Sequence, residues 1–182
     1  TPVRRPEFQE AIDRFGTGRK VILAASTHPG EDAWISTSIR DAAPEALPVI
    51  VPRHAERRHE VAADLAREGF HVVRRSDFVR EKTFPAHSVF LVDSTGELRD
   101  WTAHADVVII GKSFLSTGGQ NPCEAILASK PLICGPHMEN FEPLAGRLTA
   151  AEGCLRAHDA ASLSAAIRKA LVPAAAASLA RN

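Results

Sequence analysis

The 182-residue chain is long enough for one domain with a sizeable core, and its 45% hydrophobic and 24% charged residues are typical of a globular protein. This composition excludes a disordered, collagen-like or coiled-coil chain, and no run of apolar residues is long enough to span a bilayer. Lys and Arg total 22 and Asp and Glu total 22, so the formal net charge is zero and we expect no nucleic-acid partner.

The start of the chain and its three cysteines bear on two questions: whether the chain is part of a longer protein, and whether it holds a disulfide or a zinc site. The chain begins without Met and without a signal-peptide pattern, so we expect it to be a piece of a longer protein that forms a single domain over residues 1–182. Cys123, Cys134 and Cys154 form no C-x-x-C pair, which predicts free, mostly buried thiols rather than a disulfide framework or a zinc site.

Short apolar runs recur along the chain, each bounded by Gly, Pro, Ser or charged residues. They are continuous rather than alternating, which is typical of strands buried on both faces of a parallel sheet. The runs are residues 21–25, 47–51, 70–73, 89–92, 107–110 and 132–134.

Helical patterns lie between these runs. Their order, strand then helix then strand, predicts one doubly wound, Rossmann-like α/β domain with a parallel sheet. Residues 172–182 form either a last helix or a frayed tail. The expected helices are 31–43, 55–68 with Gly69 as its stop, 121–129, and one capped by Asp159 and ended by Pro173.

In such a sheet, ligands bind beyond the carboxyl ends of the strands, so the loops that follow the strands hold the candidate residues. These loops are rich in Gly, hydroxyl groups and potential phosphate partners. In residues 93–98 we expect a strand end, a tight turn and a helix start, where Gly96 lets a nucleotide approach the backbone. The other loops are residues 26–30, 52–54, 111–121 and 135–137.

The strongest segment is Gly-Gly-Gln-Asn-Pro-Cys-Glu over residues 118–124. Its two glycines allow close backbone approach, Asn121 suits an N-cap and Pro122 suits the first helical position. A helix N-terminus here favours a phosphate. Glu124 has two interpretations: a capping-box carboxylate that accepts from the Asn121 N–H, or an acceptor for ribose hydroxyls.

Three basic positions follow buried strands. Lys112 either neutralises a phosphate or is a solvated surface lysine, and Arg53 can stack on a base or grip an anion. We expect His54 to cap the helix that begins there, and we expect Arg57 and Arg58 to lie on a solvated helix face.

Several kinds of site are not supported by the sequence. Asp93 alone is not a metal site, and the Asp-x-Asp pattern that holds a divalent ion with a nucleotide-sugar is absent from the sequence, so we expect no metal and no other cofactor. The sequence also lacks G-x-G-x-x-G, G-x-x-x-x-G-K-[ST] and G-x-S-x-G, which removes the usual support for a dinucleotide-dependent dehydrogenase, an NTPase and an α/β-hydrolase.

Four motifs in chain order closely resemble those of the 3-deoxy-D-manno-octulosonic acid (Kdo) transferases of lipopolysaccharide synthesis. The resemblance covers roughly residues 20–150. The sequence departs from the family pattern at Gln120, where the family usually has His, at Lys112, where Gly is also common, and mildly at Ser94-Thr95. The first three motifs are Ala-Ser-Thr-His-Pro-Gly-Glu at 25–31, Val-Pro-Arg-His at 51–54 and Asp-Ser-Thr-Gly-Glu-Leu at 93–98. The fourth is a run of segments: Gly-Lys-Ser-Phe at 111–114, Gly-Gly-Gln-Asn-Pro-Cys-Glu-Ala at 118–125, Lys-Pro at 130–131 and Gly-Pro-His-Met-Glu-Asn-Phe at 135–141.

The resemblance implies a GT-B glycosyltransferase, built from two Rossmann-like halves, of which this chain is the C-terminal, CMP-Kdo-binding half. The N-terminal half would supply the membrane anchor, most of the site for the lipid A precursor acceptor, and a catalytic glutamate. It follows that this chain holds no catalytic residue and is inactive alone. The full-length enzyme would act at the cytoplasmic face of the bacterial inner membrane, with this fragment soluble.

Carried over residue by residue, the resemblance implies a donor site and a neighbouring cleft. Ser26, Thr27 and Gly30 would face the cleft between the halves. Two alternatives stay open: a GT-B enzyme or sugar-nucleotide epimerase that uses a UDP-sugar, and a non-catalytic nucleotide-binding module. The implied CMP-Kdo contacts are Pro52, Arg53, Thr95, Gly96, Glu97, Leu98, Lys112, Ser113, Gly118, Gly119, Asn121, Pro122, Cys123 and Glu124.

Overall fold

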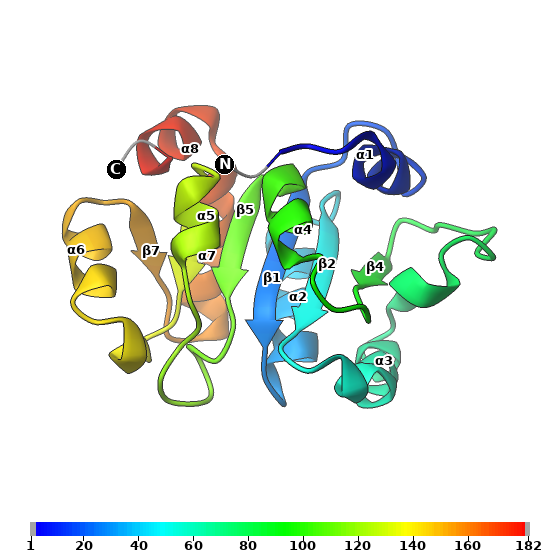
Figure 1. Ribbon diagram of the computed structural model, residues 1–182, viewed down its shortest axis with the longest axis horizontal. Helices are drawn as coiled ribbons and strands as arrows, with labels where there is room; N and C mark the ends of the chain where they lie inside the picture. Colours follow the sequence, from blue (N-terminus) through cyan, green and yellow to red (C-terminus); the bar gives the residue numbers. More distant parts are fainter. Residues whose placement is uncertain (1–2, 181–182) are drawn as a thin grey trace.

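The computed structural model describes residues 3–180, which form a seven-stranded sheet covered by helices on both faces (Figure 1). Every strand pair in the sheet is parallel, as the continuous apolar runs predict. The strand order is β3-β4-β2-β1-β5-β6-β7. The strands are β1 Val21–Thr27, β2 Leu47–Pro52, β3 His71–Arg74, β4 Ser88–Leu91, β5 Val107–Ile110, β6 Leu132–Cys134 and β7 Cys154–Arg156.

The order of the strands reverses at β1, which lies between β2 and β5 in the centre of the sheet. The loops after β1 and β5 therefore flank the point where an open α/β sheet normally binds its ligand. Six of the seven strands were expected from the sequence. The seventh, β7, was not, because its three residues include Arg156 and form no apolar run.

The helices divide between the two faces. One apolar core holds Phe8 of α1, Trp101 of α4 and Ala125 of α5, whereas the other holds Ile35 of α2 and Leu163 of α7. In Figure 1, α4 and α5 accordingly lie in front of the sheet and α2 behind it. The helices are α1 Pro6–Asp13, α2 Glu31–Ala42, α3 Arg58–Arg67, α4 Leu98–His104, α5 Cys123–Leu127, α6 Leu144–Ala150, α7 Ala160–Leu171 and α8 Pro173–Leu179, with 3-10 turns η1 Ala55–Arg57, η2 Arg75–Asp77 and η3 Glu139–Phe141.

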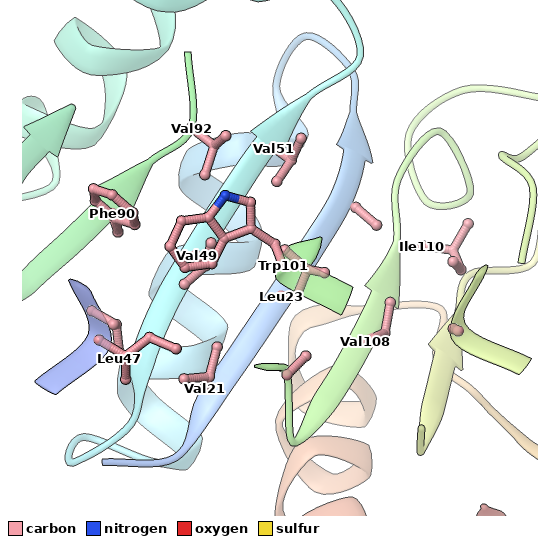
Figure 2. Close-up of a cluster of buried hydrophobic side chains, with 14 of the residues drawn as sticks. Val21, Leu23, Leu47, Val49, Val51, Phe90, Val92, Trp101, Val108 and Ile110 are labelled. Atoms are coloured by element: carbon pink, nitrogen blue, oxygen red, sulfur yellow. The ribbon is translucent and has the colours of Figure 1, made fainter. Parts of the chain in front are cut away.

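The indole of Trp101 anchors α4 on the sheet (Figure 2). It is 1% exposed, and its ring lies 4.8 Å from that of Phe8 and 5.0 Å from that of Phe90, both edge to face. Fully buried aromatic pairs of this kind add to the stability that burial alone gives. Because α4 begins at Leu98, this packing also fixes the turn that precedes the helix at the carboxyl edge of the sheet.

The helix expectations for two segments need correction. The segment 55–68 is divided into η1 and α3, and His54 makes no side-chain cap hydrogen bond, so its predicted capping role is wrong. The segment 121–129 gives only α5, five residues long, with Pro122 rather than Asn121 at the N-cap position. The helix capped by Asp159 ends at Leu171, directly before Pro173, as expected, and Pro173 then begins α8.

Other expectations at the C-terminus are confirmed. Asp159 caps α7 in a reciprocal capping box with Ser162, whose backbone N–H donates to the carboxylate at 2.7 Å. The tail is helical over Pro173–Leu179, and residues 181–182 lie outside the described part of the chain. None of the helices in residues 3–180 combines the length and apolar character needed to cross a membrane.

Candidate functional site

A small pocket of about 130 Å³ lies at the carboxyl edge of the sheet, beside the ends of β2 and β4. Most ligand pockets measure about 300–1,000 Å³, so this one has room for only part of a nucleotide. The pocket unites residues from three of the four sequence motifs, those at 25–31, 51–54 and 93–98. Its lining comprises the predicted contacts Pro52, Arg53, Thr95, Gly96 and Leu98, together with Ser26, Val51, Ala55 and Ser94.

The turn that precedes α4 exposes its backbone to this pocket. Gly96 has a φ of 84°, and a Cβ placed there would meet no atom within 4 Å. The glycine therefore provides a backbone conformation that other residues rarely adopt, beside open space. Thr95 is exposed next to it. The backbone is thus open at this turn, and the approach of a nucleotide to it stays a prediction.

The Glu97 carboxylate is engaged within the chain. It accepts hydrogen bonds from Ser94 Oγ at 2.7 Å and from both Nε and Nη2 of Arg75 at 3.2 Å. Burial acts to raise the pKa of Glu97, but the bonds from Ser94 and Arg75 outweigh it and the net shift is downward. The carboxylate thus ties the turn to η2. The predicted contact of Glu97 with the donor stays a prediction.

The predicted residues after β5 lie on a separate loop and do not line this pocket. Lys112 is partly exposed and has a φ of 54°. Ser113 is fully buried, donates to the Ile110 carbonyl oxygen at 2.5 Å and accepts from Gly135 N at 2.8 Å. Its hydroxyl is satisfied by the backbone, so Ser113 shapes the loop from within.

Gly118 and Gly119 pack against the loop that follows β6. The Gly118 N–H donates to the Glu139 carboxylate at 2.6 Å, and a Cβ at Gly119 would come within 2.6 Å of Met138 Sδ. Hydrogen bonds from backbone N–H groups and from His137 hold the pKa of Glu139 at about 2. Glycine is required at both positions for two reasons. The two loops pack too closely for a side chain, and the φ values of 106° and 70° are ones that other residues rarely adopt.

Of the two interpretations of Glu124, the structure excludes the capping box, and the contact with ribose hydroxyls stays a prediction. Asn121 Oδ1 accepts from Cys123 N at 2.9 Å, and no capping-box bond joins Glu124 to the Asn121 N–H. One carboxylate oxygen of Glu124, Oε2, is buried and has no hydrogen-bond donor among the described residues. A buried acceptor of this kind suits the hydroxyl of a ligand.

Glu31 organises the edge, although the sequence analysis assigned it no role. Its side chain is fully buried at the start of α2 and accepts from the backbone N–H of His28 at 3.0 Å, Lys112 at 2.6 Å and Phe114 at 3.2 Å. The sequence signal that marks such a residue is a carboxylate directly after a loop glycine, here Gly30, at the first turn of a helix.

Arg57 does not lie on a solvated face, which corrects the sequence-based expectation. Its Nη2 lies 2.6 Å from the Asp32 carboxylate, and the two side chains are only 12% and 1% exposed. Thr27 Oγ1 also donates to Asp32, at 2.5 Å. Burial raises the pKa of Asp32 despite these donors. The pair therefore fastens η1 to the first turn of α2, and Thr27 joins it to the end of β1.

The thiols are as expected. Cys134 and Cys154 are free and buried, with their sulfur atoms 2.7 Å apart, whereas Cys123 is free and exposed. Within residues 3–180, no three His, Cys, Asp or Glu side chains come together in a way that suits a metal ion.

Comparison with known proteins gives the following relatives. No protein-family model matches the chain. It is 42% identical over 167 residues to the 3-deoxy-D-manno-octulosonic acid transferase of Bordetella pertussis, covering 87% of this chain and 39% of that protein. It is 36% identical over 164 residues to the same-named protein of Haemophilus influenzae, covering 85% and 38%. The chain thus spans about two fifths of the length of these relatives.

Solved structures of similar proteins have the same fold as this chain. The crystal structure of the C-terminal CMP-Kdo binding domain of WaaA from Acinetobacter baumannii matches with a TM-score of 0.77 and 26% identity, over 94% of both chains. Anabaena Alr3699/HepE with UDP-glucose matches with a TM-score of 0.66, over 97% of this chain and 45% of that one, and at 13% identity it shows the fold alone. By sequence and by fold, the chain belongs with the C-terminal domains of the 3-deoxy-D-manno-octulosonic acid transferases, and it has the fold of the C-terminal domains of GT-B glycosyltransferases.

Proposed function

We propose that this chain is the donor-binding domain of a Kdo transferase and that it holds CMP-Kdo at the carboxyl edge of its sheet. One observation carries the proposal: residues expected to touch the donor, taken from the loops after β2 and β4, converge on one pocket. The pocket holds only part of a nucleotide, so the rest of the donor would lie toward the loop after β5 and the start of α5.

Each side chain has a task in this arrangement. The exposed guanidinium of Arg53 is free to grip the phosphate or stack on the base. The open backbone at Gly96 admits the nucleotide, and the unsatisfied Glu124 oxygen accepts from ribose hydroxyls. Lys112 stabilises the charge that grows on the leaving phosphate.

In the full-length enzyme, an acceptor hydroxyl attacks the anomeric carbon of Kdo while the bond from that carbon to the CMP phosphate oxygen breaks. A glutamate of the N-terminal half would take the proton of the hydroxyl. The acceptor would be a lipid A precursor at the cytoplasmic face of the inner membrane, reached through that other half. CMP leaves with a single phosphate, which two cations and backbone N–H groups suffice to neutralise, so we propose transfer without a metal.

Titration calorimetry of the chain with CMP and with UDP tests this proposal. We expect CMP to bind more tightly than UDP, equally well with and without EDTA, and we expect the chain alone to transfer no Kdo. Arg53→Ala and Glu124→Gln should each weaken CMP binding by about tenfold, because each removes a charge-assisted hydrogen bond. Arg80→Ala, which removes an exposed arginine outside the pocket, is the matched control.

The outcomes separate the alternatives. Tighter binding of UDP would identify a donor domain for a UDP-sugar. Unchanged CMP affinity in both the Arg53 and Glu124 variants would show that the site is misplaced. A chain that binds neither nucleotide would be a non-catalytic module that keeps the fold for another purpose, and the proposal would fail.

A further inference from the structure

The carboxylate of Glu31 joins two loops that are far apart in the sequence. It accepts from His28 N in the loop after β1 and from Lys112 N and Phe114 N in the loop after β5. The side chain is fully buried, so these backbone donors replace its hydration. Because β1 and β5 are neighbours at the reversal of strand order, Glu31 fixes the relative position of the loops that flank it.

Lys112 is the residue most affected by this contact. Its φ of 54° lies in the left-handed region, which is strained for a residue with a side chain. Its N–H donates to Glu31 Oε2 at 2.6 Å, and this charge-assisted bond holds the strained conformation. The preceding Gly111 has no room for a side chain, because a Cβ there would meet the Ser26 carbonyl group.

A carboxylate matches this set of contacts, because all three partners are N–H donors. It has no hydrogen to donate and two oxygens that accept, whereas an amide would turn an NH₂ group toward at least one of the N–H donors. Glu31→Gln therefore keeps the volume of the side chain but replaces an attraction with a repulsion. Since Oε2 accepts from both His28 N and Lys112 N, the amide oxygen would take that position and the NH₂ group would face Phe114 N. The shortest bond, from Lys112 N, then loses its charge assistance, and the loop that carries it is pushed away at Phe114.

We propose that Glu31 is a positioning residue of the donor site, which holds the backbone of Lys112 so that its ammonium group meets the donor phosphate. This inference rests on the proposed function and deepens it. It adds to the site a buried residue that touches no ligand itself.

The test compares CMP with cytidine, which lacks the phosphate, by titration calorimetry. Wild type, Glu31→Gln, Lys112→Ala and the double variant are measured with both ligands. Glu31→Gln should weaken CMP binding about tenfold, the loss of one charge-assisted contact, and leave cytidine binding nearly unchanged. In the Lys112→Ala background it should cause no further loss, because the two residues act through the same phosphate contact.

Asp32→Asn is the matched control, since Asp32 is the adjacent buried carboxylate and bonds Arg57 and Thr27 instead of the loop N–H groups. It should lower the melting temperature without changing the ratio of CMP to cytidine affinity. If Glu31→Gln does not fold, Glu31→Asp keeps the charge and shortens the side chain by one methylene, and it gives the same comparison.

Two results would overturn the inference while leaving the proposed function intact. One is an equal loss of CMP and cytidine affinity in Glu31→Gln, and the other is an additive loss in the double variant. A wild-type chain that binds neither ligand would overturn the proposed function itself. Amide hydrogen exchange at Lys112 and Phe114 reports the contact independently: protection should fall in Glu31→Gln and persist in Asp32→Asn.

Discussion

The Ser113 hydroxyl connects the end of β5 to the end of β6. It accepts from Gly135 N at 2.8 Å and donates to the Ile110 carbonyl oxygen at 2.5 Å. The two backbones approach so closely that a Cβ at Gly135 would overlap the Ser113 carbonyl group. Two side chains therefore hold the loop that carries Lys112. Ser113 joins it to the end of β6, and Glu31 accepts from the Lys112 N–H.

Ser113→Ala should lower the free energy of unfolding by about 1–3 kcal/mol, because it leaves the Gly135 N–H buried without an acceptor. Urea titration followed by circular dichroism measures the change. Ser116→Ala, in the same loop but partly exposed, is the control and should have an effect within about 0.5 kcal/mol. Equal effects of the two substitutions would contradict a structural role for the Ser113 hydroxyl.

The buried pair of Arg57 and Asp32 gives a second prediction. Arg57→Ala leaves the Asp32 carboxylate, which is 1% exposed, without its ion-pair partner, and should cost about 3 kcal/mol or more. Glu60→Ala removes a contact of the same guanidinium at 3.2 Å, but Glu60 is 53% exposed, so its loss should cost less than about 1 kcal/mol. Thermal unfolding of both variants distinguishes the two contacts, and similar losses would show that the Asp32 contact is no stronger than the exposed one.

Much of the fold follows from the sequence because its strands are buried on both faces. Val21, Leu23 and Ala25 of β1 lie in one core and Ile22 and Ala24 in the other, which is why the run is apolar without interruption. Parallel strands then bring their following loops to one edge, so the convergence of the β2 and β4 loops on one pocket was predictable from topology.

What the sequence does not reveal is which polar residues pair over long distances. Arg57 lies near Glu60 in a pattern typical of a solvated helix face, and its main partner, Asp32, is 25 residues away. Asn121 has the features of an N-cap, but its Oδ1 accepts from the N–H two residues on, and the helix begins later than expected. The partner of a polar side chain and the exact start of a short helix depend on tertiary packing, which local sequence patterns do not specify.

Acid should lower the free energy of unfolding, in part because it protonates the Glu97 carboxylate. Its pKa in the folded chain lies below the ordinary value of 4.5, so the folded state binds fewer protons than the unfolded state in this range. Its contribution is thus complete above about pH 4.5 and is lost as the pH falls through the folded pKa.

Glu97→Gln should accordingly be less stable than wild type at neutral pH by about 1 kcal/mol, since the Arg75 pair is partly exposed, and the difference should shrink toward zero in acid. Urea titrations at several pH values measure both chains. Glu56→Gln, an exposed carboxylate without an ion pair among the described residues, is the control. A difference that stays constant with pH would rule out the ionised Glu97 carboxylate as its source.

The exposed thiol of Cys123 offers a direct probe of the proposed site. One thiol per chain should react rapidly with a maleimide under native conditions, and the buried Cys134 and Cys154 should react only after unfolding. Because Cys123 lies beside Asn121 and Glu124, bound CMP should slow its labelling, whereas uridine should not. Protection by CMP that disappears in Glu124→Gln would tie the nucleotide to the start of α5. Labelling that is unaffected by saturating CMP would instead show that the nucleotide does not reach the start of α5 and that the part of it outside the pocket of Arg53 and Gly96 lies elsewhere.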